Sequence, residues 1–132
     1  TLLKAQKYLK SLRGAHNKKV FAILMEQGKR HVGNISLCLS PKNNSGEIAI
    51  LIGAKECWGK GVGTEAFRLL VGYAFETLCL HRVYAGMMER NIGMMRLVEK
   101  LGFHSEGVQR DAMFKNKRYW DVAIWAKINP KD

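Results

Sequence analysis

The sequence predicts an α+β domain with αβα layers, in which helices flank a mixed, mostly antiparallel central sheet. Short apolar runs separated by turn residues fill the first 52 positions, as expected for strands joined by hairpins. After position 61, two segments with helical spacing of apolar residues alternate with further strand-like runs. With 132 residues, 47% of them hydrophobic, the chain can form one core, and residues 1–132 are predicted to be a single domain.

The first half of the chain is predicted to contain one helix and three strands. Apolar residues recur at helical spacing over 2–13, with Lys and Arg between them, which predicts an amphipathic helix. Residues 20–25 and 32–39 are predicted to pair as strands across a glycine-containing turn. A second turn at 41–46 leads into a strand over 47–52, so this half should be antiparallel.

The second half is predicted to contain two helices and three strands. One helix begins at Val62 and ends near Cys79, with its apolar residues along one face. The other begins after Asn91, a suitable N-cap, and Gly102 is placed to end it. The three strands are predicted at 81–88, 104–113 and 118–128, the last two forming a hairpin around 115–117.

The most informative segment for function is the loop before the first of these helices. It reads Trp58-Gly59-Lys60-Gly61-Val62-Gly63-Thr64-Glu65-Ala66, with three glycines at every second position. Glycine lets the backbone approach a ligand with its amides pointing inward, and the helix N-terminus adds partial positive charge. Lys60 strengthens that attraction. The loop is therefore predicted to bind phosphate.

Three kinds of phosphate-binding loop have a glycine spacing similar to this one. A Walker loop needs four residues between its first glycine and the Gly-Lys pair, whereas five separate Gly53 from Gly59. Residues 61–66 fit the dinucleotide pattern G-x-G-x-x-A, with Glu89 as a candidate ribose ligand. However, a dinucleotide-binding turn lies directly at the end of a strand, whereas the apolar run at 48–52 stops well before Gly61. Too few strand–helix repeats follow for a dinucleotide-binding fold, so this match is weak. The third kind is the pyrophosphate loop of a coenzyme A site.

A second motif supports the coenzyme A interpretation. Residues 91–103 read N-x-x-x-x-R-x-x-E-K-L-G-F, and the strand at 47–53 leads into the glycine loop. Together these segments resemble the GNAT superfamily of N-acetyltransferases, and most closely its branch that acetylates ribosomal-protein N-termini. The resemblance covers roughly residues 20–128. Because GNAT domains usually open with a further strand and helix, and this chain starts at Thr1 without methionine, the N-terminal strand and helix are expected to be missing.

The resemblance implies acetyl-CoA as co-substrate, and no metal is expected. Main-chain groups of the strand are expected to bind the pantetheine arm and face the thioester oxygen, while the loop binds pyrophosphate. Asn91 has two interpretations, as an N-cap or as a side-chain contact to the pantetheine arm. The implied coenzyme-binding residues are Ile50, Leu51, Ile52, Trp58, Gly59, Lys60, Gly61, Val62, Gly63, Thr64, Asn91 and Met94.

Glu47 is the candidate general base for removing a proton from the amine, acting through water. His81, Glu106 and Tyr119 are weaker candidates, and no two histidines have metal-ligand spacing. Many relatives carry tyrosine at the position of Val98, where its hydroxyl can protonate the departing thiolate. Valine cannot do so. Since a thiol has a pKa of about 8.5, catalysis without a dedicated acid is conceivable.

Charge and composition bear on partners and location. The chain has 22 basic and 11 acidic residues, net +11, which suggests an acidic partner or nucleic acid. The charge is scattered, so nucleic acid is not expected as the main partner, and no stretch is long and apolar enough for a membrane. Three widely spaced cysteines and no signal peptide favour the cytoplasm.

The sequence therefore predicts an N-acetyltransferase that transfers acetyl from acetyl-CoA to a primary amine. The expected acceptor is an acidic protein N-terminus, such as that of a ribosomal protein, or an anionic small molecule. A homodimer is a further option. Two alternatives remain open: a non-catalytic acyl-CoA-binding module and a basic nucleic-acid-binding domain.

Overall fold

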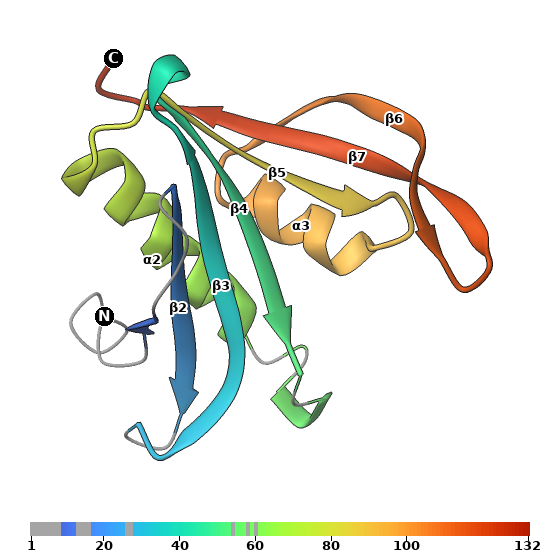
Figure 1. The fold of residues 1–132 in the computed structure, drawn as a ribbon, viewed down its shortest axis with the longest axis horizontal. Coiled ribbons are helices and arrows are strands. Elements are labelled where there is room, and N and C mark those ends of the chain that lie inside the picture. The colour runs from blue at the N-terminus through green and yellow to red at the C-terminus, as the bar shows by residue number, and fades with distance from the viewer. Residues whose placement is uncertain (1–8, 13–16, 26–27, 54, 58, 60) are drawn as a thin grey trace.

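The computed structural model describes residues 9–12, 17–25, 28–53, 55–57, 59 and 61–132. Seven strands form one sheet in the order β1-β2-β3-β4-β5-β7-β6 (Figure 1). Only β4 and β5 are parallel, and every other neighbouring pair is antiparallel. The predicted mixed, mostly antiparallel sheet is confirmed.

The first described strand lies where a helix was predicted. β1 (Leu9–Leu12) pairs antiparallel with β2 (Lys18–Met25), so the helix predicted over 2–13 is wrong for residues 9–12. The rest of that predicted helix lies outside the described residues. The spacing of apolar residues reflects only the local preference for a helix. In the fold, the backbone of β1 pairs with β2, and this pairing outweighs the local preference.

β3 (Arg30–Ser40) and β4 (Ser45–Ile52) form the next hairpin. A short 3-10 turn over Pro41–Asn43 joins them and lies within the turn predicted at 41–46. Proline suits the first position of such a turn because its φ angle is fixed. The two strands approach closely at Gly33, where an added Cβ would lie 2.3 Å from the main-chain oxygen of Leu51. Only glycine fits at that position.

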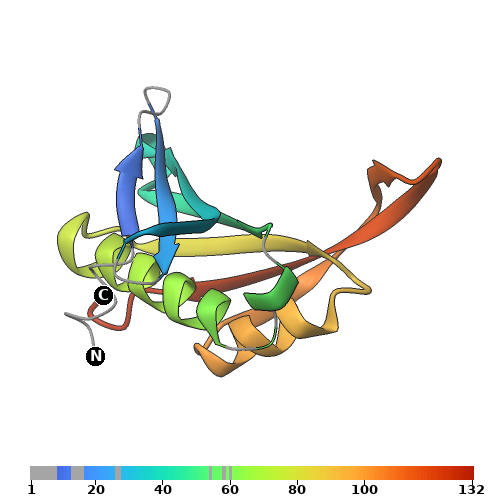
Figure 2. The same cartoon turned by 90° about the horizontal axis from the view of Figure 1, so that it is seen from below.

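The two described helices both lie on one face of the sheet (Figure 2). α2 (Val62–Gly72) continues through a π-helical turn over Tyr73–Thr77, close to the predicted end, and α3 (Ile92–Lys100) follows β5. Within the described residues the opposite face carries no helix. Neither helix has the length and apolar character that crossing a bilayer requires.

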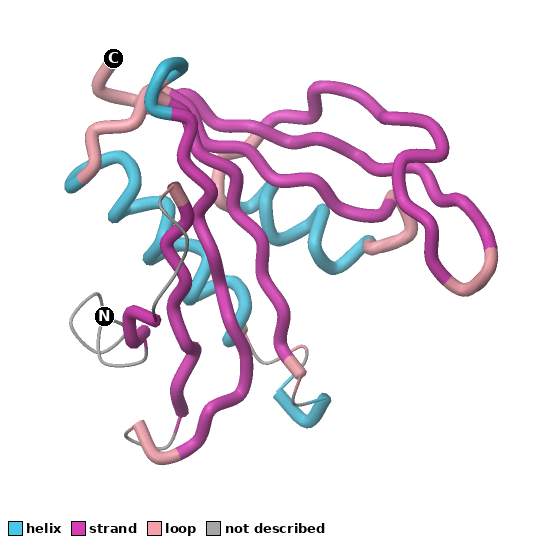
Figure 3. The backbone as a smooth tube through the Cα atoms, in the orientation of Figure 1, coloured by secondary structure: helices cyan, strands magenta, loops and turns pink. Residues whose placement is uncertain are grey.

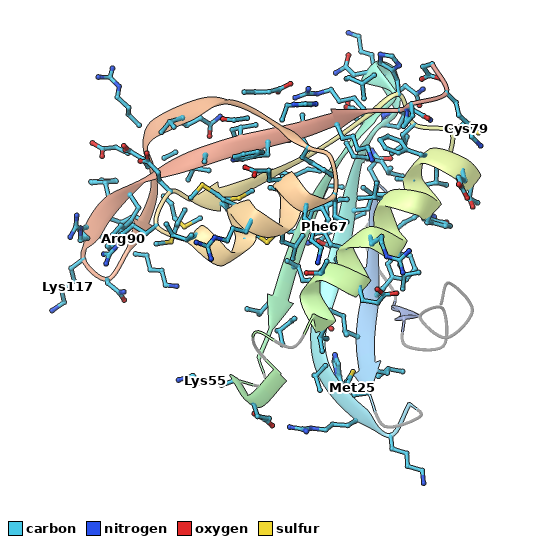
Figure 4. All side chains as sticks on the ribbon, turned by 180° about the vertical axis from the view of Figure 1, so that it is seen from behind. Met25, Lys55, Phe67, Cys79, Arg90 and Lys117 are labelled. Atoms are coloured by element: carbon cyan, nitrogen blue, oxygen red, sulfur yellow. The ribbon has the colours of Figure 1, made fainter. Side chains whose placement is uncertain are left out.

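The core lies between these helices and the sheet. Alternate residues of β3 and β5, together with Ile48 of β4, point toward the helices and are buried there. Phe67 of α2 packs edge-on against Phe103, just after α3, with ring centroids 5.6 Å apart, and it lies between the two helices in Figure 4. The largest of the fully buried side chains are those of Phe67, Ile23, Ile35, Leu37, Ile48, Leu70, Val83 and Val98.

The last three strands are β5 (Arg82–Met88), β6 (His104–Lys115) and β7 (Arg118–Ile128). β6 and β7 form the predicted hairpin, whose tip extends well beyond the rest of the sheet (Figure 1). β6 is the outer strand, and all twelve of its residues are exposed. Its pairing with β7 is irregular at two places, where Gly107 has φ +130° and Asp111 has φ +49°.

The strands β4 and β5 separate soon after they meet. Their register covers three pairs, from Ser45 with Arg82 to Glu47 with Tyr84, and then ends. β4 stays paired with β3 over its whole length, so only its β5 side is opened. The divergence is plain in the tube view (Figure 3). Because α2 follows β4 and α3 follows β5, both helices begin at the open end.

Candidate active site

A cavity of about 570 Å³ lies where β4 and β5 diverge. It is bounded by the end of β4, the glycine loop, the start of α2 and one face of α3. The lining residues are Ile50, Leu51, Ile52, Gly59, Gly61, Gly63, Thr64, Asn91, Gly93, Met94, Arg96, Leu97 and Lys100.

Most of the residues predicted to contact coenzyme line this one cavity. Of the others, Val62 is not part of the lining, and Trp58 and Lys60 lie outside the described residues. Two further cations, Arg96 and Lys100, reach the cavity from α3 and were not among the predicted residues. Both belong to the 91–103 motif, and their spacing of four places them on one side of a helix, so the signal was available.

The glycine loop has the backbone conformation of an anion site. Gly59 and Gly61 have φ of +74° and +81°, and an added Cβ at either would meet nothing within 4 Å. Glycine is therefore favoured by the positive φ and not by crowding. The amide of Glu65 donates to the oxygen of Gly61 over 3.0 Å, which begins the helix. The amides of 62–64 precede that bond and can face an anion.

Gly63 brings the start of α2 close to β4 and α3. An added Cβ there would lie 3.3 Å from Cδ1 of Ile52 and 3.6 Å from Cδ1 of Leu97. The missing side chain lets the three elements meet around one space. Arg96 and Lys100 stand on the α3 side of that space, so positive charge from side chains adds to that of the helix N-terminus.

Asn91 fulfils the predicted capping role. Its side-chain oxygen accepts a hydrogen bond from the amide of Met94 over 3.1 Å, at the start of α3. It also lines the cavity, so the two interpretations of Asn91 are compatible in this geometry. The space beside Gly93 is open, since the nearest atom to an added Cβ would be the side-chain oxygen of Asn91, 3.9 Å away.

Glu47 lies at the point where β4 and β5 separate. It is half-buried, opposite Cys38 on β3 and Tyr84 on β5. Burial raises the pKa of Tyr84, the negative charge of Glu47 raises it further, and the positive charge of Arg82 opposes the shift. The guanidinium of Arg82 lies 5.3 Å from the Tyr84 ring centroid, and two hydrogen bonds of 2.7 Å join it to Glu106.

The three weaker candidate bases are all engaged elsewhere. His81 pairs with the Asp132 carboxylate over 2.7 Å. Glu106 is bound by Arg82, and this hydrogen bonding lowers the pKa of its carboxyl. Tyr119 packs against Phe114 near the hairpin turn that Figure 4 marks with Lys117. None of the three lines the cavity, and Glu47 also lies outside its lining, three residues before Ile50 on β4.

Val98 has no exposed surface and belongs to the core. A tyrosine at this position would have to enter the packing between α3 and the sheet. The described site therefore has no hydroxyl at this point of α3.

Known proteins resemble this chain in sequence and in fold. Residues 1–104 match the family model described as Acetyltransferase (GNAT) domain. The "Probable N-acetyltransferase YjcK" of Bacillus subtilis is 51% identical over 74 residues, covering 56% of this chain and 41% of that protein. The "Putative ribosomal N-acetyltransferase YdaF" of the same species is 39% identical over 97 residues, covering 73% and 52%.

Among solved structures, the spermidine N-acetyltransferase SpeG chimera from Vibrio cholerae and hSSAT superposes with a TM-score of 0.80. The sequences are 28% identical, and the match covers 88% of this chain and 69% of that one. The chain spans only 41% to 65% of the length of the first four curated relatives.

Proposed function

Because the chain belongs to the GNAT acetyltransferase domain family, we propose that it binds acetyl-CoA in the β4–β5 cavity and transfers the acetyl group to a primary amine. The observation that carries the proposal is the convergence of a helix N-terminus, two α3 cations and an opened strand edge on one space of about 570 Å³. This arrangement suits an elongated ligand with an anionic end and an amide-rich arm.

The coenzyme is placed along the cavity by its chemistry. The pyrophosphate lies over the amides of 61–64, where helix dipole and glycine backbone favour negative charge. Arg96 and Lys100 line the same cavity, and cationic side chains form strong hydrogen bonds to phosphate. The pantetheine arm then runs along Ile50 and Leu51, whose β5 side is not paired with β5. With the arm in this orientation, the thioester lies on the Glu47 side of the cavity.

The reaction needs a base, an oxyanion donor and a leaving thiol. The acceptor reacts as the neutral amine, and its nitrogen attacks the thioester carbon. Glu47 takes, through a bridging water, the proton that this nitrogen loses. A main-chain amide on the opened side of β4 stabilises the oxyanion, and the C–S bond breaks to release the coenzyme thiolate, which takes up one proton to become the thiol.

The names of similar proteins suggest two classes of acceptor amine. YdaF is named a ribosomal N-acetyltransferase and SpeG a spermidine N-acetyltransferase. The net charge of +11 favours an acidic protein N-terminus, since like-charge encounter with a polyamine is disfavoured. We therefore propose an acidic N-terminus such as that of a ribosomal protein, with spermidine as the competing candidate.

Release of coenzyme thiol with a panel of amines tests this proposal. Peptides with acidic, neutral and basic N-terminal sequences, and spermidine, are compared at low ionic strength and at 0.1 M, where screening acts over about 10 Å. The acidic peptide should give the highest kcat/KM, and salt should lower it. Spermidine as the best acceptor at low salt would overturn the acceptor class. Binding of acetyl-CoA without turnover of any amine would indicate the non-catalytic module instead.

A further inference from the structure

Glu47 and Tyr84 form the last rung of the parallel pairing between β4 and β5. Residues directly opposite each other on neighbouring strands point to the same face of a sheet, with the strands about 4.8 Å apart. The carboxylate and the phenol therefore emerge side by side, at the apex of the divergence and next to the end of the proposed thioester path.

The surroundings of Tyr84 keep its phenol protonated. Its charged and titratable neighbours are Arg82 on its own strand, Glu47 on β4 and Cys38 on β3. On the β7 side it faces uncharged Ala126. Burial and the charge of Glu47 raise the pKa of the phenol, with Arg82 opposing, so Tyr84 carries its proton throughout the neutral range.

We propose that Tyr84 is the proton donor of the acyl-transfer reaction and works across this rung from Glu47. The inference rests on the proposed function. It assigns complementary roles to two neighbouring groups, since the carboxylate accepts the proton that the amine loses and the phenol supplies the proton that the thiolate needs.

The acceptor reacts as the neutral amine. As its nitrogen forms a bond to the thioester carbon, Glu47 accepts through water the proton that the nitrogen loses. As the C–S bond breaks, its electron pair goes to sulfur, which takes the proton of the Tyr84 hydroxyl. The resulting phenolate then recovers a proton from the Glu47 carboxylic acid through water. The net change is amine plus thioester to amide plus thiol, with both side chains restored.

Arg82 makes this cycle easier. Its positive charge near the Tyr84 ring stabilises the transient phenolate, and its pairing with Glu106 fixes its position. Cys38 lies on the other side of Glu47, away from β5, so it is less well placed to reach a sulfur in the opening. Tyr84 is the hydroxyl on the β5 side of the apex.

The variant Tyr84→Phe tests the proposal with the best acceptor of the panel. Its kcat should fall about 10²-fold, the size of a general-acid contribution, while calorimetric binding of acetyl-CoA stays unchanged. Tyr73→Phe is the matched control, because Tyr73 packs edge-on against Phe21 on the helical side of the sheet. This control should keep the native kcat.

A pH profile separates proton donation from a merely structural role. A donor must be protonated, so kcat should fall as the pH rises through the pKa of the Tyr84 phenol. Fluorotyrosine incorporated at position 84 has a lower phenol pKa and should move this alkaline limb to lower pH. An active wild type whose Tyr84→Phe variant keeps a near-native kcat and the same alkaline limb would overturn the proposal. If the wild-type protein released no thiol with any amine, the proposed function would be wrong, and the proton-donor role of Tyr84 would be wrong as well.

Discussion

The side-chain oxygen of Asn91 accepts the amide hydrogen of Met94 at the first turn of α3, and both residues line the cavity. The Asn91 cap therefore joins the stability of α3 to the shape of the candidate site. Asn91→Ala should lower the free energy of unfolding by about 1 kcal/mol, because an amide at the helix start loses its partner. Urea denaturation measures this change. Asn91→Ser retains a capping oxygen and should keep most of the stability. Equal losses in both variants would mean that the cap does not stabilise α3.

The glycine loop can be tested with a pair of matched substitutions. Gly61→Asp places a side chain and a negative charge at the proposed pyrophosphate position, so acetyl-CoA binding should be lost in calorimetry. Gly28 has nearly the same backbone, with φ +84° against +81°, and open space around it, but it lies in the turn before β3. Gly28→Asp should therefore show similar backbone strain, about 1 kcal/mol, with native affinity. Unchanged affinity in Gly61→Asp would remove the loop from the coenzyme site.

Arg96→Ala and Lys100→Ala should each weaken acetyl-CoA binding about tenfold, because hydrogen bonds to charged groups contribute about 1.5–3 kcal/mol. Affinity for acetyl-pantetheine, which lacks the pyrophosphate, should not change. Arg68→Ala is a suitable control, since Arg68 pairs with Glu65 on α2 and does not line the cavity. An equal loss for both ligands would show that the two cations support the fold of α3 and do not bind phosphate.

The Arg82–Glu106 pair predicts a pH dependence of stability. Hydrogen bonding by Arg82 lowers the pKa of the Glu106 carboxyl below its ordinary value of 4.5. The pair therefore stabilises the fold fully above pH 4.5, and this contribution is lost as the pH falls through the lowered pKa. Because the Glu106 side chain is 42% exposed, the effect should not exceed about 1 kcal/mol. Glu106→Gln should be less stable than wild type at pH 7, and the difference should shrink in acid. A difference independent of pH would exclude the ion pair as its cause.

Much of the candidate site follows from local sequence signals. The alternating glycines, the capping Asn91 and the strand before the loop each have a short-range pattern, and the structure brings them together around the predicted space. The end of α3 is equally local, because Gly102 takes the positive φ of +89° that a residue after a helix often needs.

Other features depend on register between distant strands. β1 was predicted as part of a helix because its pairing with β2 leaves no trace in apolar spacing. The pairing of Glu47 with Tyr84 requires that β4 and β5 run parallel, with one particular alignment. No local pattern near Tyr84 specifies that alignment, so the residue was not singled out from the sequence.

The irregular outer strand has a consequence for behaviour at high concentration. Twelve exposed residues along β6 would offer a long edge onto which a strand of another molecule could add, the first step of aggregation. The irregularities near Gly107 and Asp111 divide that edge into short stretches. β6 therefore offers no long continuous run of backbone groups to a neighbour, which protects the chain against edge-to-edge association while the hairpin stays exposed.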